Sequence, residues 1–133
     1  MICTSSAGIY YQTIKIKNMK IGVIGSRTFK NEKRVSNELN KYLNQVSVIV
    51  SGGANGPDSY AERWAKINNI KTNIFLPDFK SYARGAYHQR NIKIVENSNL
   101  IIAFWDGVSR GTKQTIELAK TSNIPVKIIR LGD

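Results

Sequence analysis

The sequence predicts one α/β domain, a Rossmann-like three-layer sandwich around a mainly parallel five-stranded sheet. Five short apolar runs alternate with segments of helical periodicity, and this alternation is typical of parallel sheets. The runs are rich in β-branched residues and poor in charge, as expected for strands that are covered on both faces. A length of 133 residues fits a single domain with a sizeable core.

The first half of the chain predicts two strands and two helices. A short buried strand covers 20–25 (KIGVIG), and a β-branched strand covers 46–52 (VSVIVSG). Between them, 31–46 has apolar residues on one helical face, namely Val35, Leu39, Tyr42 and Leu43. After the second strand Asp58 can cap a helix, whose inner side carries Tyr60, Ala61, Trp64 and Ala65.

The second half predicts three more strands. Residues 71–77 form a strand that Pro77 ends, and 78–89 is expected to be a loop that merges into a helix over 90–98. A fourth strand at 99–105, a helix at 111–123 and a fifth strand at 125–131 complete the domain. The domain thus spans 19–133, preceded by an extension, 1–18, with weak edge-strand alternation at 9–17.

Composition predicts a cytoplasmic protein with anionic partners. The single Cys3 excludes a disulfide framework and a Cys-rich zinc site. No secretory signal opens the chain, and no apolar run is long enough to span a membrane. The net charge of +11 favours nucleotides, nucleic acid or anionic lipid. Because the lysines are scattered, general composition explains the charge equally well.

Glycines, hydroxyls and arginines gather where predicted strands end. Ligands of open α/β sheets bind beyond these carboxyl ends. A helix N-terminus there offers free amides to an anion, and glycine lets the anion approach the backbone. The candidate nucleotide-binding residues are Gly25, Ser26, Arg27, Ser51, Gly52, Gly53, Gly56, Asp58, Arg90, Asn91, Ser109, Arg110, Gly111 and Thr112. One such turn alone could be a tight connection, but several at one sheet edge favour a ligand.

The motifs IGVIGSRTF, VSGGANGPDSYAERWA, LPDF, RN and LIIAFWDGVSRGTKQTIELA, in this order, resemble the SLOG superfamily, in particular its short YspA-like branch. The resemblance covers roughly residues 20–131. It implies a nucleotide-binding fold with NAD- or ADP-ribose-type ligands. Relatives include cytokinin-activating phosphoribohydrolases, single-stranded-DNA-binding DNA-processing proteins and sensors of NAD-derived signals in antiphage defence. On this resemblance, 25–27 forms the first turn, and 51–56 and 109–112 form two phosphate loops.

The resemblance argues against catalysis. Thr115 stands where the phosphoribohydrolases carry a glutamate, so N-glycosidic hydrolysis is not the favoured reading. Glu62 and Asp106 are the remaining acids near the sheet edge, and a solvated helix face for Glu62 and a turn-forming Asp-Gly for Asp106 explain them better than catalysis does. His88 lacks the nearby acids or histidines of a metal site or a general base. Trp105, Tyr82 and Tyr87 could each stack on a base or serve packing.

The sequence therefore favours a nucleoside phosphate, NAD-derived or ADP-ribose-type, bound by a sensor or sequestering protein in antiphage defence or counter-defence. No cofactor, metal or membrane partner is indicated. An N-glycosidase and a single-stranded-DNA binder are the alternatives. Nucleic acid is thus a less favoured partner, and a homo-oligomer is left open.

Overall fold

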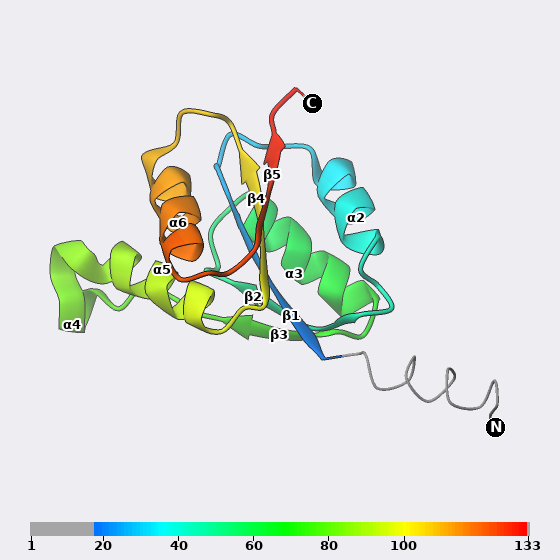
Figure 1. The fold of residues 1–133 in the computed structure, drawn as a ribbon, viewed down its shortest axis with the longest axis horizontal. Helices are drawn as coiled ribbons and strands as arrows, with labels where there is room; N and C mark the ends of the chain where they lie inside the picture. Colours follow the sequence, from blue (N-terminus) through cyan, green and yellow to red (C-terminus); the bar gives the residue numbers. More distant parts are fainter. Residues whose placement is uncertain (1–17, 133) are drawn as a thin grey trace.

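The computed structural model describes residues 18–132 and confirms the predicted α/β class. Five strands form one sheet in the order β3-β2-β1-β4-β5, and all four neighbouring pairs are parallel (Figure 1). The strands are β1 (Met19–Gly25), β2 (Val46–Ser51), β3 (Lys71–Ile74), β4 (Leu100–Trp105) and β5 (Val126–Arg130).

The strand order reverses beside β1, at the centre of the sheet. The chain first moves outward from β1 through β2 to β3, and then returns to place β4 on the other side of β1. In this register Ile21 lies opposite Ile49 of β2 and Leu100 of β4. The carboxyl ends of β1 and β4 therefore form a topological switch point, where open α/β sheets bind ligands.

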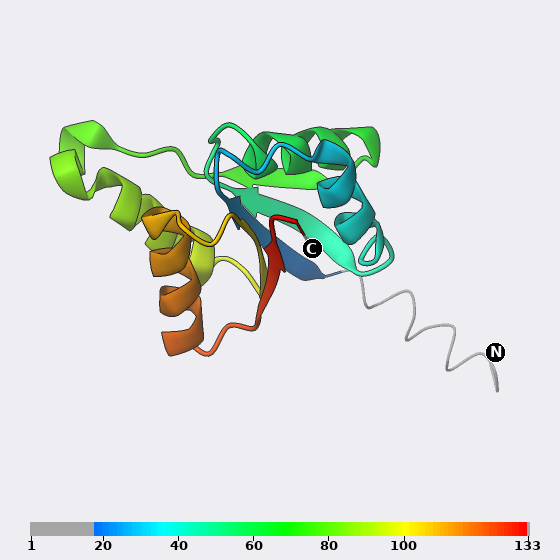
Figure 2. The same cartoon turned by 90° about the horizontal axis from the view of Figure 1, so that it is seen from above.

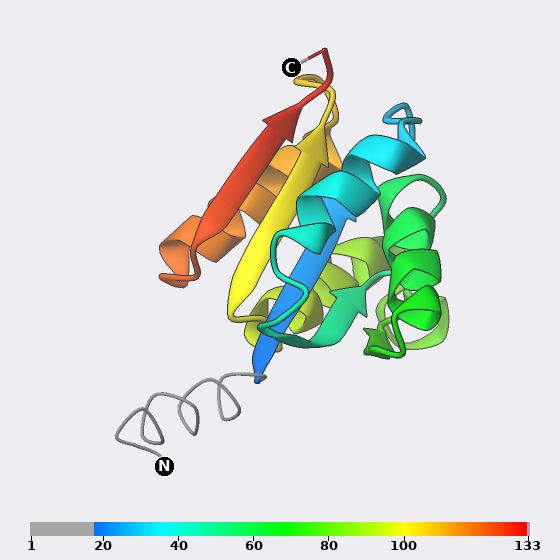
Figure 3. The same cartoon turned by 90° about the vertical axis from the view of Figure 1, so that its right-hand side faces the viewer.

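Helices cover both faces of the sheet, so the domain has three layers. Helices α2 (Glu32–Asn40) and α3 (Pro57–Ile67) cover one face, and α5 (Ala86–Glu96) and α6 (Arg110–Thr121) cover the other (Figures 1 and 3). Because strand side chains alternate between faces, each strand contributes to two cores. Val23 and Phe104 are buried with α2 and α3, whereas Ile24 and Ala103 belong to the core of α5 and α6.

Helix α2 is shorter than its apolar pattern predicts. The Asn31 side chain accepts a hydrogen bond from the Arg34 amide over 3.0 Å and starts the helix. The helix ends at Asn40, and a series of turns leads to β2. Tyr42 and Leu43 lie in these turns, yet they still pack against the core. Their apolar character therefore reports burial rather than helix.

The predicted loop at 78–89 is wrong, because most of it is helical. A short helix, α4 (Phe79–Tyr82), and a 3-10 turn, η1 (Ala83–Gly85), precede α5, which begins at Ala86. Asp78 starts α4 by accepting a hydrogen bond from the Ser81 amide. Figure 2 shows α4 at the far left, projecting beyond the sheet. Residues 74–87 are called the arm below.

The outer strand β3 is shorter than predicted, since only Lys71–Ile74 pairs with β2. All four residues are exposed, as on an edge strand rather than a strand covered on both faces. The possible strand at 9–17 lies outside the described residues. No helix within 18–132 has the length and apolar character needed to cross a membrane.

Candidate functional site

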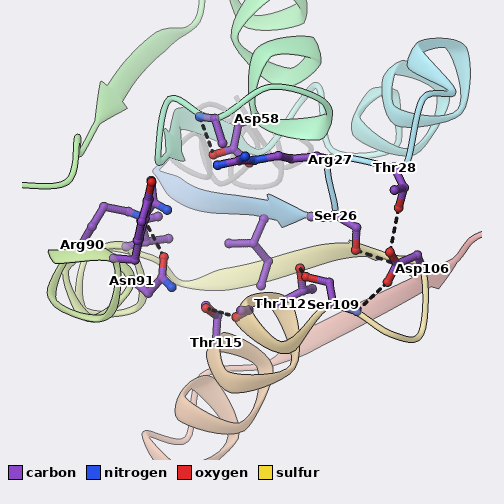
Figure 4. A pocket seen from close by; sticks show the side chains of 16 residues that line it. Ser26, Arg27, Thr28, Asp58, Arg90, Asn91, Asp106, Ser109, Thr112 and Thr115 are labelled. Carbon is purple, nitrogen blue, oxygen red and sulfur yellow. Dashed lines mark hydrogen bonds between the residues drawn. The ribbon is translucent and has the colours of Figure 1, made fainter. Parts of the chain in front are cut away.

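A cavity of about 460 Å³ opens at the carboxyl ends of β1 and β4 (Figure 4). It lies at the switch point of the sheet, between α5 and the N-terminus of α6. Sixteen residues line it: Ile24, Gly25, Ser26, Arg27, Thr28, Ala54, Asp58, Tyr87, Arg90, Asn91, Ile94, Asp106, Ser109, Gly111, Thr112 and Thr115. The lining thus comes from four segments that are far apart in the sequence: 24–28, 54–58, 87–94 and 106–115.

Asp106 connects the two turns that follow β1 and β4. Its Oδ2 accepts a hydrogen bond from Thr28 Oγ1 over 2.7 Å. Its Oδ1 accepts from the amides of Val108 and Ser109, both over 2.8 Å, and its own amide donates to Ser26 Oγ. The hydrogen bond from Thr28, followed by those from the two amides, lowers the pKa of Asp106 to about 2. The carboxylate is therefore ionised at neutral pH, and its hydrogen bonds hold the turns after β1 and β4 together.

The N-terminus of α6 is open toward the cavity. The Ser109 side chain does not cap the helix, although Ser109 Oγ and Thr112 Oγ1 share a hydrogen bond of 3.2 Å. Among the described residues, none accepts a hydrogen bond from the amides of Gly111 and Thr112. Free amides and the positive end of the helix dipole together make this end attractive to an anion.

Asp58 holds the glycine-rich loop instead of capping α3, which corrects the predicted cap. Gly56 occupies the cap position, and Pro57 is the first helical residue. The Asp58 side chain turns back into the loop, where Oδ2 accepts from the amides of Gly52 (2.9 Å) and Ala54 (3.3 Å). Two amides that a phosphate could have used are therefore occupied by a carboxylate of the same chain.

Asp58 is only 5% exposed. Burial raises the pKa of Asp58 to about 6, although the Gly52 and Ala54 amides and the nearby charge of Arg90 oppose the rise. Its second oxygen, Oδ1, accepts no hydrogen bond from residues 18–132. Since no side-chain oxygen there is both fully buried and unpaired, Oδ1 reaches the cavity that Asp58 lines. It is an acceptor available to a ligand.

Arg90 joins α5 to the same loop. Its Nη1 donates a hydrogen bond to the Gly52 carbonyl over 2.6 Å, and its Nε donates to Asn91 Oδ1 over 2.7 Å. A Cβ at position 52 would overlap the Arg90 guanidinium. Gly52 is therefore required by the close approach of Arg90. Gly53 has a φ of 71°, so it is required by the backbone conformation of the loop.

Arg27 and Arg90 bring two positive charges to the cavity. Burial lowers the pKa of Arg90, and the neighbouring charge of Arg27 lowers it further, while Asp58 opposes the change. Arginine nevertheless stays protonated in proteins. The Arg27 side chain is exposed and makes no hydrogen bond or ion pair with the part of the chain that the structure describes. Figure 4 shows Arg27 beside Asp58 and Arg90 beside Asn91.

The structure brings most of the predicted site residues to this one cavity. Gly25, Ser26, Arg27, Asp58, Arg90, Asn91, Asp106, Ser109, Gly111 and Thr112 all line it. Six predicted residues do not line it: Ser51, Gly52, Gly53, Gly56, Glu62 and Arg110. Ser51 Oγ instead donates to Glu62 Oε2 over 2.6 Å, away from the cavity. The glycine-rich loop 51–56 thus shapes the site through its contacts with Asp58 and Arg90 more than through its own backbone.

Several residues of the cavity were not predicted from the sequence to belong to the site. Tyr87, for example, was considered only as an aromatic residue that could stack on a base or serve packing. Tyr87, Arg90, Asn91 and Ile94 follow the spacing of one helical face, and all four line the cavity. That spacing was hidden because the helix was predicted to begin only at Arg90. Thr115 likewise lies one helical turn after Thr112, and its Oγ1 donates to the Gly111 carbonyl over 2.9 Å.

Three of the aromatic and histidine candidates, Trp105, Tyr82 and His88, lie outside the cavity. Trp105 donates from Nε1 to the Ser109 carbonyl over 3.0 Å and lies against the Arg130 guanidinium, so its ring supports the turn after β4. His88 is exposed and does not line the cavity. Within 18–132, no group of three His, Cys, Asp or Glu side chains is arranged to hold a metal ion.

Comparisons with known proteins agree with this architecture. The model of the YspA, cpYpsA-related SLOG family matches residues 19–82. The Gene 61 protein of Mycobacterium phage D29 is 31% identical over 123 residues, an alignment that covers 86% of this chain and 97% of the phage protein. The family match includes β1, the glycine-rich loop and Asp58, but it ends before Arg90 and α6.

Two solved structures of DNA processing protein A share the fold. The protein from Streptococcus pneumoniae superposes with a TM-score of 0.73 at 24% identity, over 89% of this chain and 52% of that one. The Helicobacter pylori protein, whose structure describes a single-stranded DNA binding mode, superposes with a TM-score of 0.63 at 21% identity. That match covers 92% of this chain and 70% of that one. This chain thus spans about half the length of the S. pneumoniae protein.

Proposed function

Because the chain belongs to the YspA, cpYpsA-related SLOG family, we propose that its cavity binds a nucleoside phosphate and holds it without cleaving it. One observation carries the proposal. Arg27 and Arg90 direct two positive charges into a cavity that also receives the uncapped N-terminus of α6. Charged donors and free amides that converge in this way are the chemistry that recognises phosphate.

The phosphate is assigned to the space between Arg27 and α6. Arg27 has no partner among the described residues, so it can donate two parallel hydrogen bonds to phosphate oxygens. The amides of Gly111 and Thr112 and the hydroxyls of Ser109 and Thr112 supply further donors. Gly111 suits this position because its missing side chain leaves the backbone open to the cavity.

The ribose is assigned to the side of the cavity that Asp58 and Asn91 line. A bare phosphate ion needs only donors, whereas a nucleotide also carries ribose hydroxyls that need acceptors. Asp58 Oδ1 reaches the cavity as a free acceptor. The Asn91 amide group has its oxygen engaged by Arg90, which leaves its NH₂ to donate. This mixture of donors and acceptors favours a nucleoside phosphate over inorganic phosphate.

Holding the ligand is favoured over hydrolysing it. Of the described residues that line the cavity, Asp58 and Asp106 are the only carboxylic acids. Asp106 is ionised and both of its oxygens are engaged. Thr115 lies in the cavity with its hydroxyl donated to a carbonyl of its own helix. An N-glycosidase would thus depend on Asp58 alone as a proton donor.

An NAD-derived or ADP-ribose-type nucleotide is the favoured ligand, held by a sensor or sequestering protein. Similarity to a phage protein supports a role in defence or counter-defence during infection. The cytoplasmic location expected from the sequence stays a prediction, and so does the division into 1–18 and 19–133.

Calorimetric titration tests the proposal with four probes: adenosine, adenosine monophosphate, ADP-ribose and ribose 5-phosphate. We expect both nucleotides to bind and adenosine to bind far more weakly, because it lacks the phosphate. Mass spectrometry of small molecules released from the purified protein tests the natural ligand. Equal binding of adenosine and its monophosphate, or no binding of any probe, would contradict the proposal.

Single-stranded DNA is the second candidate ligand. The net charge of +11 and the fold shared with the DNA-binding H. pylori protein favour it. If the charge serves mainly free nucleotides, binding of a fluorescent oligonucleotide should be weak and should fall steeply with salt. Submicromolar, length-dependent binding at physiological salt would instead identify single-stranded DNA as the ligand.

A further inference from the structure

The arm exposes an aromatic pair beside the cavity. The rings of Phe79 on α4 and Tyr87 on α5 meet nearly at right angles, at 82°, with centroids 5.3 Å apart. Phe79 is 55% exposed and Tyr87 is 48% exposed. Ile74 and Leu76, at the start of the arm, are exposed too. An exposed apolar patch of this kind is typical of a binding surface.

Tyr87 belongs both to the aromatic pair and to the cavity. It lines the cavity together with Arg90, whose guanidinium carbon lies 5.5 Å from the centroid of the Tyr87 ring. The pair is thus continuous with the part of the cavity that Asp58 and Asn91 line. A ligand that places a ribose there can extend directly onto the two rings.

We propose that the Phe79–Tyr87 pair binds the base of the nucleotide whose phosphate lies between Arg27 and α6. Two perpendicular rings form a corner, in which a planar base can stack on one ring and meet the edge of the other. Nucleobases suit such a corner because every base has a π-face. The exposed Lys80 and Arg84 on the arm also favour an anionic ligand over a neutral one.

This inference rests on the proposed nucleotide site and assigns its specificity. Inorganic phosphate or ribose 5-phosphate would fill only the inner part of the cavity. A base on the aromatic pair would add affinity without any hydrogen bond to its edge. The site would therefore distinguish nucleotides from sugar phosphates more strongly than it distinguishes one base from another.

The test compares Tyr87→Leu with the wild-type protein. Leucine keeps an apolar side chain but removes the ring. We expect adenosine monophosphate to bind roughly 5- to 150-fold more weakly, as for the loss of one stacked base. Binding of ribose 5-phosphate should be unchanged. Phe79→Leu should act in the same direction, whereas Tyr87→Phe, which keeps the ring, should bind like wild type.

Tyr82→Leu is the matched control, because Tyr82 is an exposed tyrosine of α4 that does not line the cavity. A fluorescent purine nucleotide gives a direct readout, since stacking quenches it; quenching should be lost in Tyr87→Leu and kept in Tyr82→Leu. A short single-stranded oligonucleotide, titrated in parallel, shows whether the base comes from a free nucleotide or from DNA.

The outcomes separate this inference from the proposed function. If wild type binds adenosine monophosphate and Tyr87→Leu weakens it no more than it weakens ribose 5-phosphate, the base site is wrong and the phosphate site stands. If wild type binds neither compound nor the oligonucleotide, both proposals are wrong. Circular dichroism of each variant confirms that a loss of binding does not come from unfolding.

Discussion

The Asp58 carboxylate accepts a hydrogen bond from the Gly52 amide over 2.9 Å, inside the loop that connects β2 to α3. The Gly52 carbonyl, on the same residue, accepts one from Arg90 over 2.6 Å. Gly52 alone thus links the acidic Asp58 of α3 to the positively charged Arg90 of α5. The shape of the cavity depends on this link, because Asp58 and Arg90 both line it.

Asp58→Asn should change how stability depends on pH. Burial raises the pKa of Asp58 to about 6 in the folded chain, well above the 3.8 that is usual for an aspartate. Between these values the folded chain binds more protons than the unfolded one, so the free energy of unfolding falls as pH rises. This titration lowers the free energy of unfolding by about 3 kcal/mol in total, and the decrease is complete above roughly pH 7. Asparagine keeps an oxygen for the Gly52 amide but has no proton to lose.

Urea unfolding at a series of pH values measures this effect. The stability of Asp58→Asn relative to wild type should rise between about pH 4 and pH 7 and should be level outside that window. Glu117→Gln, a change at an exposed glutamate of α6, is the control. Parallel curves for wild type and Asp58→Asn would show that Asp58 titrates normally.

Arg27→Ala should weaken nucleotide binding and leave the fold intact. The side chain has no partner within the described residues, so its loss should not change the melting temperature. Loss of a charge-assisted contact of about 1.5–3 kcal/mol corresponds to a roughly ten- to 150-fold loss in affinity. Arg110→Ala is the comparison, because Arg110 is exposed at the start of α6 and does not line the cavity.

Titration of both variants with ADP-ribose decides between the two arginines. A larger loss in Arg110→Ala than in Arg27→Ala would place the phosphate on the outer side of α6 instead of inside the cavity.

Gly111→Ala should stabilise the protein while it weakens nucleotide binding. A Cβ at this position meets nothing within 4 Å, and the residue lies in the first turn of α6. Replacing a helical glycine by alanine without strain stabilises a protein by about 0.4–1 kcal/mol. The same methyl group would occupy space where the phosphate should approach the helix amides. Thermal unfolding and calorimetry on one preparation measure both effects.

Gly53→Ala provides the contrast to Gly111→Ala. Gly53 has a positive φ, and its new Cβ would meet the Leu76 side chain, away from the cavity. It should lower stability and leave affinity unchanged. Affinity that is equal in Gly111→Ala and wild type would show that the ligand does not contact the start of α6.

Adenosine monophosphate should not be turned over. The sequence lacks the glutamate of the phosphoribohydrolases, and the structure leaves Asp58 as the one lining acid with a pKa near the working range. Chromatography for free adenine after prolonged incubation measures turnover. Release of adenine that Asp58→Asn abolishes, and Glu62→Gln does not, would show an N-glycosidase with Asp58 as its acid.

Sequence periodicity predicted the sheet and most of the helices, because buried strands and amphipathic helices leave clear patterns. It failed at 78–89, where Asp78, Ala83 and Gly85 interrupt the pattern and the helical turns are short. It also extended β3 beyond Ile74 to Leu76, which is apolar but exposed on the arm, whereas Phe75 packs against the core of α5 and α6. Apolar residues on an exposed arm cannot be told from strand residues by pattern alone.

The site was predictable as a sheet edge but not in its inner geometry. Helix termini and strand ends indicated Arg27 and the start of α6. The roles of Asp58 and Gly52 depend on a contact with Arg90, which lies 38 residues further along the chain from Gly52. No local pattern encodes such a contact. Glycines that make room for a side chain of the same protein look identical, in sequence, to glycines that make room for a ligand.

The two outer strands have a consequence for self-association. Within residues 18–132, β3 and β5 are the borders of the sheet, and each carries an exposed cation, Lys71 and Arg130. Unpaired strand borders can recruit a strand from another copy, and positive charge placed there opposes this. Dissolved ions screen such repulsion over about 10 Å at 0.1 M ionic strength. We therefore expect light scattering to detect growing aggregates as salt is added. In Lys71→Glu, the new negative charge on β3 of one copy would face the positive Arg130 on β5 of another copy, so this variant should aggregate even in dilute buffer.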